Sequence, residues 1–231
     1  MTTGPKQDFS RYDQKLEFIL RTAARIFAEK GYHSTSMRDI SRATEVSLAG
    51  LYYYCRSKEE LLFLIQDNCF GRVLERLEER LRETNDAVEK LRIFIENHLS
   101  FFAANMAEMK VLSHEAESLD GEMRDAVSNK KRQYTRLARR ILSEVQQGLG
   151  EEQRQIDLTI ATYALFGMMN WIYNWYDPRG KLSVGDLVEN VTRLFLTGFL
   201  AGTNVERLTF ASPRKAERLS VWRAPQGDGT Q

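Results

Sequence analysis

Between Pro5 and Pro178 the chain contains no proline, and apolar residues recur there at the three- and four-residue spacing of an α-helix. No alternating run is long enough to predict a strand. The pattern therefore predicts an all-α protein. Its predicted helices are residues 16–30, 36–44, 47–54, 57–82, 88–102, 123–145, 156–176 and 184–202.

Composition narrows the class of protein. The formal net charge is only +1, so any binding of nucleic acid must depend on a local basic surface rather than on overall charge. Cys55 and Cys69 share no metal-ligand spacing with the three histidines, and no cofactor motif is present, so we expect neither a metal nor a cofactor. The polar N-terminus and the absence of a long apolar run predict a cytoplasmic protein without a membrane segment.

Residues 22–62 predict a helix-turn-helix. A scaffold helix ends at Gly31, and a short helix then directs Met37 and Ile40 inward. After a tight turn at Glu45, Ser47 caps a second short helix. In a helix-turn-helix the first short helix crosses the DNA backbone, and the second lies in the major groove.

The same stretch resembles the N-terminal signature of the TetR family of transcriptional regulators. The elements in register are Gly31-Tyr32, Ile40, Val46-Ser47, Leu51-Tyr52-x-Tyr54 and Lys58-Glu59-x-Leu61. The resemblance implies a homodimer that binds an inverted-repeat operator in double-stranded DNA. It implies a helix-turn-helix domain followed by a helical domain for ligand binding and dimerisation.

The resemblance also implies roles for individual residues in DNA binding. Thr35 and Ser36 would contact phosphate, Arg38 would reach a base edge, and Lys58 would anchor a phosphate. The remaining predicted DNA contacts surround or form the recognition helix and are Ser47, Leu48, Ala49, Gly50, Tyr52 and Tyr53.

Three positions depart from the family pattern. Glu45 stands where the turn usually has glycine, which predicts a slightly different turn. Leu48 stands near the start of the recognition helix, where the family often has a lysine. This replacement predicts base contacts that are more apolar. Cys55 replaces a phenylalanine, and its small side chain favours burial over a redox role.

The last two predicted helices are apolar on wide faces. Ile160 and Met168 lie on one face of the helix over 156–176, and Leu165 and Met169 lie on the adjoining face. One face must be core, and the other can meet a partner subunit or a cavity. Since TetR-like proteins dimerise through their last two helices, the resemblance implies an interface at Val191, Phe195, Gly198 and Gly202.

Residues 167–183 resemble TetR-type regulators that sense acyl-CoA thioesters, through Asn170-Trp171, Trp175-Tyr176, Pro178 and Gly180. A CoA ligand needs cations for its phosphates. Lys130 and Lys131 flank the apolar stripe of the helix over 123–145, and these two lysines are the phosphate candidates. The predicted pocket residues are Met168, Trp171, Trp175, Lys130 and Lys131.

The sequence therefore predicts three segments, a DNA-binding domain over 1–56, a ligand-binding and dimerisation domain over 57–210, and a polar tail over 211–231. The predicted function is that of a transcriptional repressor. A small hydrophobic effector such as an acyl-CoA is expected to release it from its operator. A free drug-like molecule is the alternative effector. A helical enzyme or adaptor is the alternative class, but no catalytic motif supports an enzyme.

Overall fold

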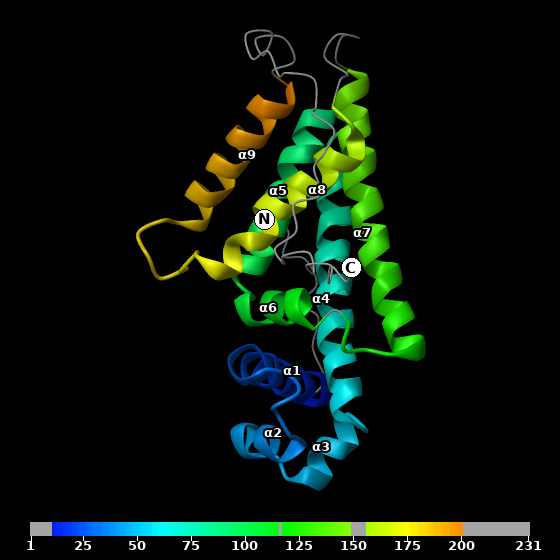
Figure 1. The fold of residues 1–231 in the computed structure, drawn as a ribbon, viewed down its shortest axis with the longest axis vertical. Helices are drawn as coiled ribbons and strands as arrows, with labels where there is room; N and C mark the ends of the chain where they lie inside the picture. Colours follow the sequence, from blue (N-terminus) through cyan, green and yellow to red (C-terminus); the bar gives the residue numbers. More distant parts are fainter. Residues whose placement is uncertain (1–10, 116, 149–155, 201–231) are drawn as a thin grey trace, which may run out of the picture.

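The computed structural model describes residues 11–115, 117–148 and 156–200, and every element in those ranges is helical. The all-α prediction is confirmed. Figure 1 shows α1, α2 and α3 at one end and a larger group of helices at the other, with α4 running from the first group into the second. The elements are α1 (Arg11–Lys30), α2 (Met37–Thr44), α3 (Leu48–Tyr54), α4 (Lys58–Leu81), α5 (Ala87–Ala103), α6 (Met106–His114), α7 (Gly121–Gln147), α8 (Leu158–Asn170), the 3-10 turn η2 (Trp171–Asn174) and α9 (Val184–Leu200).

Local signals in the sequence set most helix boundaries. Ser36 caps α2 together with Asp39, whose carboxylate accepts from the Ser36 backbone, and Ser57 caps α4 through the Glu60 amide. Gly31 follows α1 with φ of 84°, a left-handed conformation that suits glycine at a helix end. These short polar signals are why the first four helices lie close to their predicted ranges.

Two elements differ from the prediction. The sequence analysis missed α6, whose nine residues are too few for a clear apolar period. The predicted helix over 156–176 is α-helical only to Asn170 and then tightens into η2. Gly202, predicted in the last helix, lies outside the described residues.

Two clusters of buried side chains stabilise the fold. The larger cluster joins α4, α5, α7, α8 and α9. The smaller one joins α1, α2 and α3 to the first turns of α4, and it also takes in Val111, Leu119 and Val127 from the region of α6 and α7. The core of the N-terminal helices therefore extends beyond the predicted boundary at residue 56. No helix in the described ranges is long and apolar enough to cross a membrane.

Candidate DNA-binding surface and ligand cavity

The N-terminal helices present one exposed polar and aromatic surface. Ser36 and Arg38 are exposed on and beside α2, and Ser47 and Ala49 are exposed at the start of α3. Tyr52 and Tyr53 are 50% and 72% exposed. The helix-turn-helix geometry therefore brings together most of the residues predicted to contact DNA.

Tyr12 of α1 lies beside the tyrosines of α3, which sequence reasoning did not anticipate. Its ring centroid lies 5.8 Å from that of Tyr53 and 4.9 Å from that of Tyr54. Since Tyr12 precedes the motif that carries the family resemblance, no sequence signal linked it to this surface. The contact packs the first turn of α1 against α3 and restricts how far Tyr53 can move.

Thr35 is not placed to bind phosphate through its hydroxyl. Its side chain is buried, and its Oγ1 donates to the Gly31 carbonyl at 2.8 Å. The hydroxyl closes the loop between α1 and α2, which corrects the predicted contact.

Lys58 is also committed within the chain. Its ammonium donates to the carbonyls of Tyr32 and Thr35, at 2.9 Å each, and lies 4.3 Å from the centroid of the Tyr32 ring. The predicted phosphate anchor is therefore a lysine that holds the loop before α2.

The turn between α2 and α3 has the left-handed residue that the motif requires. Glu45 has φ of 55° and ψ of 26°, a conformation that costs a residue with a side chain about 1–2 kcal/mol. The turn is thus kept despite the glutamate, and the expected change of turn does not occur. A Cβ added at Gly50 would lie 2.9 Å from Val46 Cγ1, so this glycine is needed for packing within the motif.

Cys55 is 1% exposed, and burial raises the pKa of its thiol to about 11. Burial likewise raises the pKa of Cys69, to about 12. Both thiols are therefore protonated at neutral pH, when thiolate is the reactive form. The expectation that Cys55 is a small buried residue is confirmed.

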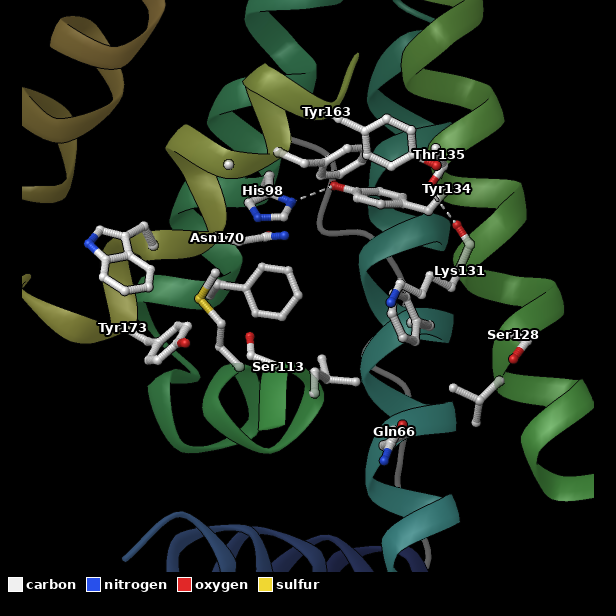
Figure 2. A pocket seen from close by; sticks show the side chains of 18 of the residues that line it. Gln66, His98, Ser113, Ser128, Lys131, Tyr134, Thr135, Tyr163, Asn170 and Tyr173 are labelled. Atoms are coloured by element: carbon white, nitrogen blue, oxygen red, sulfur yellow. Dashed lines mark hydrogen bonds between the residues drawn. The ribbon is translucent and has the colours of Figure 1, made fainter. Parts of the chain in front are cut away.

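A cavity of about 490 Å³ lies in the larger group of helices, a size within the usual range of about 300–1,000 Å³ for ligand sites. Its walls are mainly apolar, and Figure 2 shows polar groups at several points around it. Among the residues that line it are Gln66, Phe102, Leu119, Val127, His98, Tyr134, Asn170, Arg124, Lys131 and Trp171.

Two of the five predicted pocket residues line this cavity. Trp171, the first residue of η2, is 60% exposed, and Lys131 lies on α7. Lys130 instead forms an ion pair with Asp67, Nζ to Oδ1 at 2.6 Å, and lines a different groove. Met168 packs on the core and Trp175 is 54% exposed, and neither lines the cavity.

The sequence analysis also missed the polar lining, His98 and Tyr134 among it. Both are buried on faces of α5 and α7 that are otherwise apolar, so from sequence they are indistinguishable from core residues. Arg124, one turn before Val127, was missed because it is exposed and charged.

The predicted dimer contacts divide between core and surface. Val191 and Phe195 are buried in the chain's own larger cluster, so they are not available to a second subunit. Gly198 is exposed, with no atom within 4 Å of an added Cβ. Among the side chains of α8 and α9 that the structure describes, the large apolar ones most exposed are different, namely Ile160, Tyr163 and Leu194, each more than 60% exposed.

The N-terminal helices form a helix-turn-helix, and one continuous helix joins them to a helical domain that contains a cavity. This arrangement is typical of DNA-binding regulators. Comparison with known families agrees. Residues 19–65 match the model described as bacterial regulatory proteins, tetR family, and residues 84–199 match the tetracyclin repressor-like C-terminal domain. The chain belongs to the TetR family of transcriptional regulators, as its sequence motif predicted.

Individual relatives support this assignment over most of the chain. The fatty acid metabolism regulator protein of Bacillus subtilis is 27% identical over 194 residues, covering 84% of this chain and 97% of the relative. The transcriptional repressor KstR2 of Mycolicibacterium smegmatis is 24% identical over 197 residues, with coverage of 84% and 93%. The crystal structure of AibR in complex with isovaleryl coenzyme A and operator DNA is 30% identical, covers 78% of this chain and 97% of that one, and has a TM-score of 0.69. The relatives are regulators and not enzymes.

Proposed function

We propose that this chain is a dimeric repressor that binds an inverted-repeat operator and leaves it when a hydrophobic, acidic effector fills the cavity. The observation that carries this proposal is the position of the cavity. Leu119 and Val127 line it, and the same two residues belong to the core that α1, α2 and α3 share. A ligand that moves these side chains must therefore disturb the support of the DNA-binding helices.

Hydrogen bonds provide a second route from the cavity to the DNA-binding helices. Gln66 lines the cavity, and its Nε2 donates to the Glu115 carbonyl at 3.0 Å. The Glu115 carboxylate accepts from the backbone N–H of Tyr32, in the loop before α2. Lys58 holds the same loop from the other side. By reciprocity, operator DNA should weaken effector binding by the factor that effector weakens DNA binding.

The lining of the cavity favours an effector with an apolar body and an anionic end. Lys131 contributes positive charge, as does Arg124, whose Nε also lies 3.6 Å from Oδ1 of Asp125 on the exposed surface of α7, and no aspartate or glutamate is among the described lining residues. An acyl-CoA thioester has this combination, and AibR, which is similar to this chain, was crystallised with one. A free hydrophobic acid is the alternative effector.

Exposed apolar side chains on α8 and α9 support a dimer that joins these two helices to their copies in a four-helix bundle. Leu194 is 67% exposed and Ile160 is 68% exposed. Solvent exposure of such residues is unfavourable in an isolated subunit, and burial of each by a partner would remove apolar area from water.

Leu194→Glu should convert the dimer to monomer, because two buried carboxylates would have to be desolvated across the two-fold axis. Operator affinity should fall by at least ten-fold, since a monomer contacts one half-site. Sedimentation velocity and a labelled-operator titration measure the two effects. Arg136→Glu, at an exposed position of α7, is the control and should stay dimeric. A dimeric Leu194→Glu protein would place the interface on another surface.

Arg38→Ala should weaken binding to the cognate operator by about 1–3 kcal/mol and relax preference at one base pair, because a base contact is lost. Tyr52→Phe should weaken binding to every DNA sequence by a common factor, since a phosphate contact carries no sequence information. Titration against an operator and its single-base variants separates the two patterns. Arg136→Ala, which removes the same charge far along α7, should change neither. Equal effects of Arg38→Ala on every sequence would reassign that residue to the backbone.

A further inference from the structure

One buried polar atom in the cavity has no hydrogen-bond partner. In the described ranges, five buried side-chain atoms lack a partner, and they belong to Arg80, Asn97, His98, Tyr176 and Thr192. Of these residues only His98 lines the cavity, and its free atom is Nε2. Burying a polar group without a partner costs about 1–3 kcal/mol, so such an atom in a binding cavity marks a contact that a ligand can complete.

The His98 ring is held in place by aromatic neighbours and one hydrogen bond. Its Nδ1 lies 3.2 Å from the hydroxyl of Tyr134, as the dashed line in Figure 2 shows. Its centroid lies 4.7 Å from that of Phe102 and 6.0 Å from that of Phe166. The ring is therefore fixed before a ligand arrives, which limits the entropy lost on binding.

The imidazole is neutral. Burial lowers the pKa of His98 to about 3, and the neighbouring Asn170 amide opposes this only in part. A neutral imidazole has one N–H and one lone pair. If the Tyr134 hydroxyl donates to Nδ1, the ring proton is on Nε2, and the unpartnered atom is a hydrogen-bond donor.

The polar side chains of the cavity differ in how far they are exposed to solvent. His98 and Tyr134 are 3% exposed each, whereas Arg124 and Lys131 on α7 are exposed. A ligand that matches this order has a neutral acceptor in its buried part and anionic groups nearer to solvent. Asn170, which Figure 2 shows beside His98, raises the pKa of the ring, but no contact from it to Nε2 has the geometry of a hydrogen bond, so Nε2 stays open to a ligand.

We infer that Nε2 of His98 donates a hydrogen bond to the carbonyl oxygen of an acyl thioester, while Lys131 and Arg124 contact the CoA phosphates outside. This assignment rests on the proposed function and identifies the atom that distinguishes a thioester from an apolar chain of the same length. The acyl chain then lies against Phe102 and Phe166, where the cavity is apolar.

The test uses two ligands that differ only at this oxygen, octanoyl-CoA and its thioether S-octyl-CoA. Calorimetric titration of the full chain should give a Kd for the thioester roughly ten-fold lower than for the thioether. His98→Phe, which keeps an aromatic ring without nitrogens, should bind both ligands equally. Tyr134→Phe should reduce the preference for the thioester over the thioether, because Nδ1 then loses the donor that selects the tautomer. This variant provides the test if His98→Phe does not fold.

Lys131→Met is the matched control. It should weaken both CoA ligands by the same factor and leave their ratio unchanged, since it removes a phosphate contact and not the carbonyl contact. Equal affinity of the wild-type protein for the two ligands would overturn the assignment of His98 alone. If neither CoA compound binds or releases a labelled operator, while octanoate does, the proposed thioester effector is wrong and this inference with it.

Discussion

Lys58→Met should lower the free energy of unfolding by roughly 2 kcal/mol and weaken operator binding without changing its salt dependence. The methionine keeps the apolar stem but removes the ammonium that bonds the carbonyls of Tyr32 and Thr35. Hydrogen bonds from a charged group contribute more than neutral ones, and the loop they hold sets the position of α2. Urea denaturation gives the stability, and operator titrations between low and moderate salt give the slope.

A phosphate anchor at Lys58 predicts a different result. Loss of one such contact would reduce the slope of log Kobs against log salt by about 0.9 and leave stability unchanged. Lys131→Met, at an exposed site on α7, is the control and should keep both the wild-type stability and the wild-type slope. A smaller slope in the Lys58→Met protein alone would restore the phosphate role.

Acidification should destabilise the wild-type protein through His98. The pKa of this imidazole is lowered from 6.5 to about 3 in the folded state, so below pH 6.5 the unfolded chain binds a proton that the folded chain does not. Stability is therefore complete above pH 6.5 and falls by about 1.4 kcal/mol per pH unit toward pH 3. Between pH 7 and pH 5 the loss from this group should be about 2 kcal/mol.

Urea denaturation at the two pH values measures this loss, and His98→Gln should reduce it because the variant has no group to titrate there. Tyr134 is the titratable group in contact with the imidazole, and burial raises the pKa of its hydroxyl further above this pH range. Glu108 contributes in the opposite sense, since burial raises its pKa above 4.5. Equal pH dependence in wild type and variant would show that His98 is not the group responsible.

The sequence predicted the parts of this protein that local chemistry determines. Caps at Ser36, Ser47 and Ser57 and the glycine at 31 determine where the first helices begin and end, and the helix-turn-helix followed from them. The exposed surface of α3 was predicted as well, because α3 is a short helix whose only fully buried residue is Leu51.

Features that depend on tertiary contacts could not be predicted in this way. Lys58 and Thr35 fit the family pattern, yet their donors face carbonyls that only the folded loop brings near. Lys130 and Lys131 are adjacent in sequence, but Asp67 of α4 neutralises the first and leaves the second beside the cavity. His98 has no local signal at all, because a buried histidine on an apolar helix face is recognised as polar lining only when the cavity is known.

The placement of Leu119 and Val127 in the N-terminal core has a consequence for protein engineering. Regulators with new input signals are made by joining the DNA-reading half of one protein to the sensing half of another. In this chain a junction after residue 56 would separate Leu61, Leu62 and Ile65 from the side chains they pack against, and would expose the surface that Leu119 and Val127 cover. A working hybrid must therefore carry the start of α4 with the N-terminal helices and match residues 111–127 of the recipient to them, so the two halves are exchangeable only as a fitted pair.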